Sequence, residues 1–280
     1  MKIIRKIKEF QKYSDEKRRQ GKTICLVPTM GALHEGHLSL IRRARSESDV
    51  VAVSIFVNPT QFGPEEDYAK YPRNFKKDSL LCKKAGADVL FYPSAREMYP
   101  ERRLTTVSVA GLSQKLCALS RPGHFEGVAT VVCKLFNIAK PHIAYFGKKD
   151  FQQFLIVRKM AKDLNIDVRI KGGATVREKD GLALSSRNRY LSKKERREAV
   201  CLNEALRRAE YLIKEIGMRD CRSIVKEMKS IIRAYPSTRV DYINITDAET
   251  LEDVRRIKGR VLIAMAVFVG KTRLIDNTVV

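Results

Sequence analysis

The first 170 residues alternate between short apolar runs and segments with the periodicity of an amphipathic helix. The apolar runs, which we predict to be strands, cover residues 23–29, 49–57, 87–93, 142–146 and 166–170. Helices are expected between them, from Gly36 onward and over residues 73–85, 125–139 and 150–164. Short apolar strands that alternate with helices form right-handed βαβ units. This part of the chain is therefore expected to be an α/β domain, a Rossmann-like parallel sheet with helices on both faces.

The pattern changes after about residue 175. Ser192 and Glu195 have the spacing of a capping box at the start of a helix. Two helices and three strands are expected, over residues 193–216, 221–234, 240–245, 261–269 and 271–275. Strands that are adjacent in sequence favour an antiparallel sheet. We therefore predict two domains, a larger one over residues 1–175 and a smaller C-terminal α+β domain over residues 176–280.

The chain carries a large positive charge. Its 280 residues include 55 lysines and arginines against 32 aspartates and glutamates, which leaves a formal net charge of +23. A charge of this size indicates a nucleic acid or an anionic membrane as partner, and the alternative is a basic surface with a smaller anionic ligand. The basic residues are spread along the chain, and there is no zinc knuckle, separate basic arm or aromatic platform motif for RNA. An apolar content of 44% excludes a disordered chain.

Six cysteines occur without the C-x-x-C spacing of a zinc or redox site. They are expected to be free, buried thiols in a reducing compartment. The longest uninterrupted apolar run, residues 261–269, is too short to cross a membrane. Residues 1–13 are charged and lack the apolar core of a signal peptide. We therefore expect a cytoplasmic protein with no membrane partner.

Two of the four histidines lie in the sequence M-G-A-L-H-E-G-H at residues 30–37, directly after the first predicted strand. The N–H groups at a helix N-terminus attract phosphate, and Gly31 and Gly36 allow a ligand to approach the backbone closely. The imidazoles of His34 and His37 can stabilise charge that develops at a reacting phosphorus. The alternatives are two helix-capping histidines or two metal ligands, and a metal would need a third ligand. We predict a site for nucleotide phosphates.

Further polar clusters follow the later strands of the predicted sheet. Asn58 and Gln61 lie in a loop stiffened by prolines, where amides suit a hydroxylated substrate. Taken alone, however, this cluster is more typical of an ordinary turn with Asn58 as a strand cap. Asp150 suits either a helix N-cap or a ribose contact, with Lys149 near phosphate and Gln153 on the same side of the helix. Ligands of parallel sheets bind beyond the carboxyl ends of the strands, so these clusters are expected to meet at one edge.

Two more segments contain candidate ligands. The segment R-E-K-D-G-L-A-L-S-S-R-N at 177–188 offers two hydroxyl groups and an arginine to a triphosphate. Its place at the domain boundary makes it a candidate lid, and the alternative is a solvated interdomain loop. In the sequence R-P-G-H at 121–124, His124 suits a helix cap as well as it suits a functional role.

Five segments together resemble the pantothenate synthetase family, which are AMP-forming pantoate–beta-alanine ligases of the H-x-G-H nucleotidyltransferase superfamily. The segments are P-T-M-G-A-L-H-E-G-H at 28–37, F-V-N-P-T-Q-F at 56–62, R-P-G-H-F-E-G-V at 121–128, F-G-K-K-D-F-Q-Q at 146–153 and R-E-K-D-G-L-A-L-S-S-R-N at 177–188. They occur in the family's order and span nearly the whole chain, which makes the combination highly specific.

The resemblance implies an enzyme of pantothenate and coenzyme A biosynthesis, a ligase that joins (R)-pantoate to β-alanine. The carboxylate of pantoate would attack the α-phosphate of ATP, bound with Mg²⁺, to give pantoyl adenylate and pyrophosphate. The amine of β-alanine would then displace AMP and give pantothenate. The resemblance also implies a homodimer with small-molecule substrates and no nucleic acid, and a strand edge expected at residues 104–112 is a candidate dimer interface.

The resemblance also implies roles for the matched positions. His34 and His37 would be catalytic and would bind the ATP phosphates. Gln61 and Gln153 would bind pantoate, and Gln61 would also lie near β-alanine. Gly147 and Asp150 would hold the ribose. The complete set of further ATP-binding positions would be Met30, Gly31, Ala32, Leu33, Glu35, Gly36, Asn58, Gly147, Lys148, Lys149, Asp150, Val176, Leu184, Ser185, Ser186 and Arg187, with Val176 at the adenine. No motif implies ligands for the magnesium ion.

Two positions depart from the family pattern. Lys148 occupies a position that is usually Glu or Gln, and Leu184 stands where the motif usually has Met. A change from Met to Leu conserves volume, and Lys148 adds a cation without removing a matched contact. The alternatives to the ligase are another adenylating enzyme of the superfamily and a basic RNA-binding protein. Asn58, Gln61 and Gln153 favour the ligase, because the wider superfamily does not share them.

Overall fold

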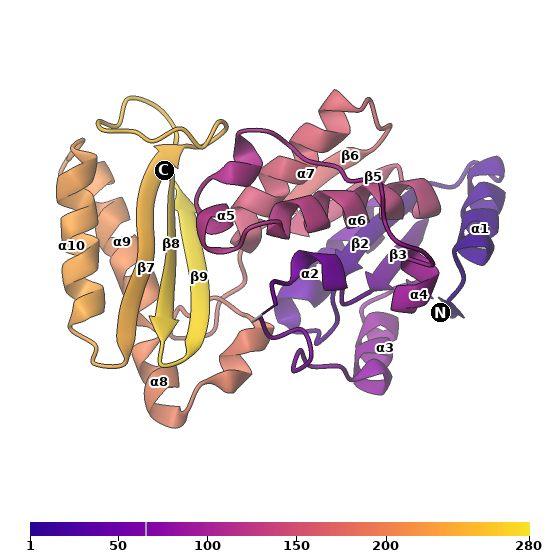
Figure 1. Ribbon diagram of the computed structural model, residues 1–280, viewed down its shortest axis with the longest axis horizontal. Coiled ribbons are helices and arrows are strands. Elements are labelled where there is room, and N and C mark those ends of the chain that lie inside the picture. Colours follow the sequence, from indigo (N-terminus) through magenta and orange to yellow (C-terminus); the bar gives the residue numbers. More distant parts are fainter. Residues whose placement is uncertain (65) are drawn as a thin grey trace. The chain divides into compact units, whose positions relative to one another are not determined.

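The computed structural model describes residues 1–64 and 66–280. The chain divides into two compact units. The N-terminal unit comprises Met1–Ser113, Ala118–Lys148 and Gln152–Ala174, and the C-terminal unit comprises Gln114–Cys117, Lys149–Phe151 and Thr175–Val280. Figure 1 colours the chain along its sequence, so the N-terminal unit begins in indigo and the C-terminal unit ends in yellow.

A six-stranded parallel sheet forms the centre of the N-terminal unit (Figure 1). Its strands are β1 (Lys2–Ile4), β2 (Ile24–Thr29), β3 (Val50–Ile55), β4 (Val89–Phe91), β5 (Ile143–Gly147) and β6 (Arg169–Gly173), in the order β1-β4-β3-β2-β5-β6. Every neighbouring pair is parallel, which confirms the predicted parallel sheet. The sequence did not predict β1, because three residues are too few to show a period.

Helices cover both faces of this sheet. They include α1 (Ile7–Arg19), α2 (Glu35–Glu47), α3 (Phe75–Lys84), α6 (His124–Ala139) and α7 (Phe151–Asp163). On one face, Val27 of β2 and Val53 of β3 belong to a core with Leu40 of α2 and α3. On the other face, the ring of Phe10 in α1 lies 4.9 Å from that of Phe91 in β4, and α1 packs beside α6. Burial of both faces explains why the strands are continuous apolar runs.

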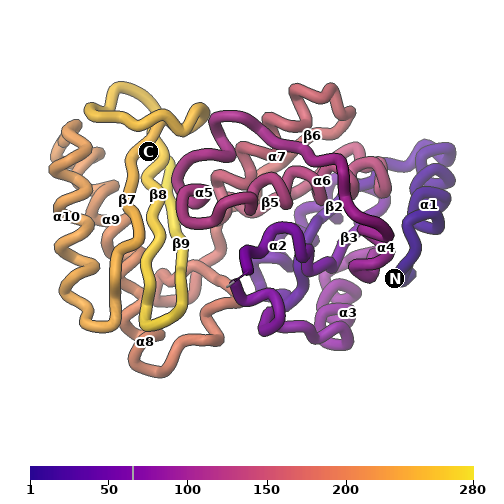
Figure 2. The backbone as a smooth tube through the Cα atoms, in the orientation of Figure 1, coloured from indigo at the N-terminus to yellow at the C-terminus, as the bar shows by residue number. Residues whose placement is uncertain are grey.

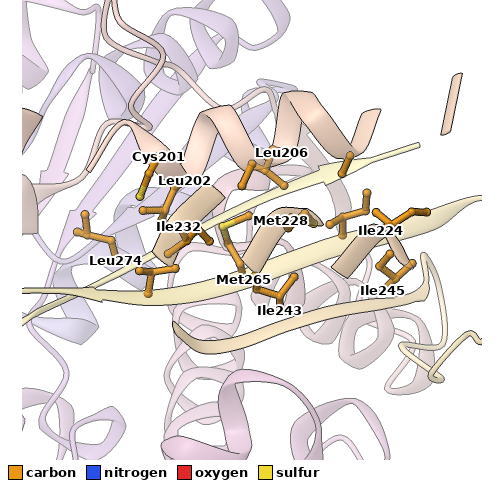
Figure 3. Packing of buried hydrophobic residues seen from close by; sticks show 14 of the residues in the cluster. Cys201, Leu202, Leu206, Ile224, Met228, Ile232, Ile243, Ile245, Met265 and Leu274 are labelled. Carbon is orange, nitrogen blue, oxygen red and sulfur yellow. The ribbon is translucent and has the colours of Figure 1, made fainter. Parts of the chain in front are cut away.

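The C-terminal unit contains a three-stranded antiparallel sheet. The central strand β8 (Val261–Val269) pairs with β7 (Thr238–Asp247) on one side and with β9 (Thr272–Val279) on the other. The helices α9 (Cys201–Lys214) and α10 (Cys221–Arg233) share a core with this sheet, and Figure 3 shows Leu206, Met228 and Met265 within it. The predicted α+β region with an antiparallel sheet is confirmed.

Several predicted elements have different bounds in the structure. The helix expected over 193–216 is divided into α8 (Lys193–Glu198) and α9. The reason is that the N–H groups of Leu202 and Asn203 donate to carbonyls three residues back, which interrupts the α-helical register. The predicted capping box is present at the start of α8. In addition, β9 continues beyond residue 275 to Val279, and β6 begins at residue 169 instead of 166.

The strand expected over residues 104–112 is absent, so the prediction of a strand edge there is wrong. This segment runs between α4 (Ala95–Met98) and α5 (Cys117–Ser120) as irregular backbone and ends in the short turn η2 (Leu112–Gln114) (Figure 2). A strand requires backbone partners along its length, whereas the N–H of Val107 donates to the hydroxyl group of Thr130.

The cysteines are free thiols, as the sequence predicts. Five are buried and Cys133 is half-buried. Burial raises the pKa of Cys25 and of Cys82 to about 12, so these thiols stay protonated and unreactive. Within residues 1–64 and 66–280, no helix is both long enough and apolar enough to cross a membrane.

His142 precedes β5 at the amino end of the sheet and makes stability depend on pH. Its Nδ1 accepts a hydrogen bond of 2.9 Å from the N–H of Ile24, and burial, assisted by the charge of Arg18, lowers its pKa. The folded state therefore favours the neutral ring. This contribution to stability is present above the pKa of an unfolded histidine and is lost as the pH falls through the lowered folded value.

We expect the free energy of unfolding in urea to decrease between about pH 7.5 and about pH 5.5, on either side of the ordinary histidine pKa. His142→Asn is the matched variant, since its amide oxygen can accept from Ile24 but does not titrate. The variant should lose less stability over the same range. An equal loss in both proteins would contradict the role of His142.

Candidate active site

Three predicted clusters lie at the carboxyl ends of neighbouring strands. β3, β2 and β5 are adjacent and parallel, so their carboxyl ends share one edge of the sheet. Residues 30–37 follow β2, Asn58 and Gln61 follow β3, and Gly147 ends β5. A hydrogen bond of 3.1 Å from the amide of Gln61 to the sulfur of Met30 joins the first two clusters. The structure thus brings these residues of the N-terminal unit to one edge.

The loop between β2 and α2 has an unusual backbone. Gly31 and Ala32 have φ values of 86° and 50°, in the left-handed region. The hydroxyl of Thr29 accepts from the N–H of Gly31 at 3.1 Å, and the carboxylate of Asp78 accepts from the N–H groups of Ala32 and Leu33 at 2.9 Å each. Sequence reasoning missed Asp78, which belongs to α3. Acidic residues are common in the first turn of a helix, so no signal in the sequence marked this contact.

The imidazoles of His34 and His37 lie against each other at the N-terminus of α2. Their ring centroids are 4.1 Å apart, with an angle of 44° between the planes. The N–H of His34 donates to Nδ1 of His37 at 3.3 Å, so the neutral ring of His37 carries its proton on Nε2. A Cβ atom at position 36 would lie 3.0 Å from the ring of His34, so any larger residue than glycine would crowd that ring. With the positive end of α2, the pair offers N–H donors to an anion.

The other residues of this motif are placed differently. Ala32 and Leu33 are buried, and Asp78 already occupies their N–H groups. Glu35 is exposed and forms an ion pair with Arg42. The candidate donors to an anion in this motif are therefore the two imidazoles. The backbone N–H groups of Ala32 and Leu33 are already used.

Asn58 is the centre of a buried hydrogen-bond network. Its side-chain oxygen accepts from the hydroxyl groups of Thr60 and Tyr99 at 3.0 Å each. Its NH₂ group donates to the side-chain oxygen of Gln61 and to the carbonyl of Gly127 at 3.1 Å each. With 1% exposure and these partners, Asn58 orients Gln61 so that the NH₂ group of Gln61 is turned away from Asn58.

Arg121 and His124 hold the same loop from another side. Arg121 pairs with Glu66 at 2.5 Å and donates to Nε2 of His124 at 3.0 Å. Nδ1 of His124 lies 2.8 Å from the carbonyl oxygen of Gln61. A carbonyl only accepts and a guanidinium only donates, so His124 is neutral with its proton on Nδ1. In this structure His124 fixes the backbone of Gln61.

The two adjacent glutamines of α7 have different surroundings. Gln152 is buried and donates to the carbonyl of Leu112 at 2.8 Å. Gln153 is half-buried. Successive helical residues point in directions about 100° apart, so the structural bond of Gln152 leaves Gln153 as the ligand candidate.

The remaining predicted ligands belong to the C-terminal unit. Residues 176–184 form a hairpin in which the N–H of Leu184 donates to the carbonyl of Val176 at 2.9 Å. Ser185 caps the turn η4 (Ser186–Tyr190), with its hydroxyl accepting from the N–H of Arg187. Val176 is thereby joined to the segment 184–187. Lys149 is held by its carbonyl, which accepts from the amide of Asn277 at 2.7 Å, and Asp150 is exposed.

Two ion-pair groups, which sequence reasoning missed, anchor this hairpin. Arg177 makes two hydrogen bonds, of 2.6 and 2.9 Å, to the buried carboxylate of Asp276 in β9. Arg196 of α8 pairs with Glu178 at 2.7 Å and with Asp180 at 2.8 Å. The hydrogen bond from Arg196 lowers the pKa of Asp180. The partners of Arg177 and Arg196 are distant in sequence, so a local sequence pattern could not predict these ion pairs.

Comparison with known proteins identifies the family. The model of the family described as pantoate-beta-alanine ligase matches residues 2–279. The chain belongs to the pantoate–beta-alanine ligase family. It is 55% identical over 279 residues to the pantothenate synthetase of Thermotoga petrophila, covering 100% of this chain and 99% of that protein. The resemblance seen in the sequence is confirmed.

Solved structures of this ligase family have the same fold. The pantothenate synthetase of Thermus thermophilus superposes with a TM-score of 0.94 at 43% identity and covers 99% of both chains. The pantoate–beta-alanine ligase of Francisella tularensis, complexed with beta-gamma ATP and beta-alanine, has a TM-score of 0.82 at 36% identity, covering 99% of this chain and 97% of that chain.

The two departures from the family pattern have simple surroundings in this ligase. Lys148 is exposed, and its aliphatic stem covers Gly172 of β6, where an added Cβ would lie 2.7 Å from Cε. Leu184 is half-buried and takes part in the hairpin through its backbone. Neither departure removes a hydrogen bond that holds the candidate ligands.

A magnesium site made by the protein would need several side-chain ligands close together. The described residues contain no group of three His, Cys, Asp or Glu side chains that could hold a metal ion. The buried carboxylate of Asp78 already accepts from the N–H groups of Ala32 and Leu33. Among residues 1–64 and 66–280, the side chains therefore do not form a magnesium site on their own.

Proposed function

We propose that the protein condenses (R)-pantoate with β-alanine at the expense of ATP, through an enzyme-bound pantoyl adenylate, and releases AMP and pyrophosphate. The observation that carries this proposal is the match of the ligase family to residues 2–279. The complex of the Francisella tularensis ligase with beta-gamma ATP and beta-alanine supports it. The paired imidazoles at the N-terminus of α2 supply the chemistry that adenylation requires.

In the first step, a carboxylate oxygen of pantoate forms a bond to the α-phosphorus of ATP, and the bond from that phosphorus to pyrophosphate breaks. No proton has to be removed from a carboxylate. The task of the site is to position two anions and to stabilise the charge that develops on the phosphates. We propose that His34 and His37 do this as donors, His37 through its Nε2–H.

In the second step, the amine of β-alanine attacks the acyl carbon, the bond from that carbon to the AMP oxygen breaks, and the amine loses a proton. We propose that Gln61 and Gln153 hold pantoate, with Gln61 also near β-alanine. The oxygen of Gln61 accepts from Asn58, and one hydrogen of its NH₂ group donates to the sulfur of Met30, so the other hydrogen would donate to a substrate oxygen.

For ATP we propose contacts from both parts of the sequence. Residues 1–175 would form the ATP- and pantoate-binding domain, and residues 176–280 a lid domain. Gly147 and Asp150 would hold the ribose and Val176 the adenine. The phosphate ligands would be Lys149, Ser185, Ser186 and Arg187, with Lys148 adding a cation.

We propose that Mg²⁺ enters as part of the ATP complex and is held mainly by the phosphates. This agrees with the lack of a three-ligand group among the described side chains. The ion would supply charge neutralisation when bound, and none of the steps above depends on a protein-metal bond.

We further propose a cytoplasmic homodimer. The free thiols support a reducing compartment, and cell fractionation tests it. The dimer rests on the family resemblance, and light scattering of the purified protein tests it.

The experiment that tests this function is product analysis with one substrate omitted at a time. Pantothenate and AMP should form in equal amounts, and only when pantoate, β-alanine and ATP are all present. Another adenylating enzyme would turn over with a different acid. A protein of the RNA-binding class would form neither product and would bind RNA at moderate salt.

A further inference from the structure

The carboxylate of Asp78 fills the turn that precedes the two active-site histidines. It accepts from the consecutive N–H groups of Ala32 and Leu33 at 2.9 Å each, and the residue is 2% exposed. Successive N–H groups in a left-handed turn form a concavity that binds anions. Here the protein supplies that anion from α3, 46 residues further along the chain. A phosphate of ATP is therefore excluded from this concavity.

The bonds of Asp78 hold a backbone that the local sequence does not favour. Ala32 has a φ of 50°, and the left-handed region costs a residue with a Cβ roughly 1–2 kcal/mol. Gly31 is also left-handed, and a Cβ there would lie 3.1 Å from a carboxylate oxygen of Asp78. The two charge-assisted hydrogen bonds offset this cost. Two residues after Ala32, His34 caps α2.

We propose that Asp78 is a positioning residue for the adenylation step. By fixing the turn at Ala32 and Leu33, it sets the place of His34 and His37 against the ATP phosphates, although it contacts no substrate itself. This proposal rests on the proposed function in one respect, because the expected loss of kcat presupposes that the protein is the ligase. The placement of the two imidazoles is a separate consequence that can be measured without ATP.

A purely structural role for Asp78 predicts a different result. The residue lies in the first turn of α3, where a carboxylate stabilises the helix dipole. Loss of that effect would lower stability and leave the kinetics of the folded enzyme unchanged. Loss of positioning would lower kcat in protein that is still folded.

The direct test is Asp78→Asn. The amide oxygen can accept from one of the two N–H groups, but the NH₂ group then faces the other N–H as donor against donor. We expect kcat to fall about 10²-fold, as small misplacements of catalytic groups do, with little change in KM for ATP. Rescue should be partial in Asp78→Glu, which keeps both oxygens but displaces them.

Asp88→Asn is the matched control. Asp88 also accepts from a backbone N–H, that of Val51 at 2.8 Å, and pairs with Arg45 at 2.6 Å. It precedes β4 at the amino end of the sheet, away from the edge that carries His34 and His37. This variant should lose stability while its kcat stays at the wild-type value.

The four histidines of the chain allow a second readout by imidazole ¹H–¹⁵N NMR of the ligand-free protein. In Asp78→Asn the signals of His34 and His37 should move while that of His142 stays, and in Asp88→Asn the signals of His34 and His37 should not move. A folded Asp78→Asn with wild-type kcat, or with unmoved signals of His34 and His37, would overturn the proposal.

If Asp78→Asn does not fold, kcat and the NMR signals of His34 and His37 are measured in Asp78→Glu instead. Wild-type values of both would then overturn the proposal. If the wild-type enzyme shows no turnover with pantoate, the proposed function fails. The NMR comparison still tests the positioning role of Asp78 in that case.

Discussion

Replacing His37 with alanine should lower kcat by about 10² or more while the protein stays folded. The Nε2–H of His37 is one of the donors that the N-terminus of α2 presents, and its orientation is set by the bond from the N–H of His34 to Nδ1. Donors that act on charge developing in the transition state affect kcat more than KM. Steady-state kinetics with circular dichroism as a check of folding measures this.

A glutamine at position 37 separates two roles of the histidine. The amide NH₂ group of His37→Gln can occupy the place of Nε2–H and donate, but it cannot transfer a proton. Since carboxylate attack requires no base, we expect His37→Gln to retain far more activity than His37→Ala. Equal losses in the two variants would indicate proton transfer by His37. His142→Asn, at the amino end of the sheet, is the control and should keep the wild-type rate.

Replacing Arg177 with methionine should cost the C-terminal unit about 3 kcal/mol of stability. The variant leaves the carboxylate of Asp276, which is 2% exposed, buried without its cationic partner. The hairpin of residues 176–184 also loses its link to β9, so the apparent affinity for ATP should fall. Urea unfolding and the KM for ATP measure the two effects.

Two further variants control for this interpretation. Arg196→Met removes the more exposed ion pairs of the same hairpin, to Glu178 and Asp180, and should cost less than about 1 kcal/mol. Adding Asp276→Asn to Arg177→Met removes the unpaired charge and should restore part of the lost stability. A cost for Arg177→Met no greater than that for Arg196→Met would show that the buried pair does not hold the hairpin.

The elements of the fold that were predicted correctly are those whose burial produces a regular pattern of apolar residues in the sequence. Strands β2 and β3, which lie within the runs at 23–29 and 49–57, are covered on both faces of a parallel sheet, so every residue of these strands is apolar or small. The division between α8 and α9 was missed because it depends on hydrogen bonds three residues back, to which the apolar spacing is insensitive. The irregular segment at 104–112 alternates like a strand, yet a strand exists only where another strand pairs with it.

The candidate site was predictable where it follows strands and unpredictable where it depends on distant partners. His34, Asn58 and Gln61 were expected at one sheet edge, and lie there, because residues that directly follow neighbouring parallel strands gather at that edge. Their supporting residues were missed. Asp78 reaches the turn at Ala32 and Tyr99 reaches Asn58 across 46 and 41 residues of sequence, and contacts of this range leave no local pattern.

The size of the positive charge indicated an anionic partner but could not indicate which one. The folded chain places some of the basic residues in structural pairs, such as Arg121 with Glu66 and Arg177 with Asp276. Those cations are engaged within the protein. The net charge is therefore a weaker guide to the ligand than the few side chains at the carboxyl edge of the sheet.

The central claim, adenylation of pantoate, is tested most directly by isotope exchange between pyrophosphate and ATP without β-alanine. Reversal of the first step should move label from pyrophosphate into ATP only when pantoate and magnesium are present. His37→Ala should lose the exchange, and Asp88→Asn should retain it. Exchange without pantoate would contradict the account. So would the absence of exchange from folded wild-type protein supplied with ATP, labelled pyrophosphate, pantoate and magnesium.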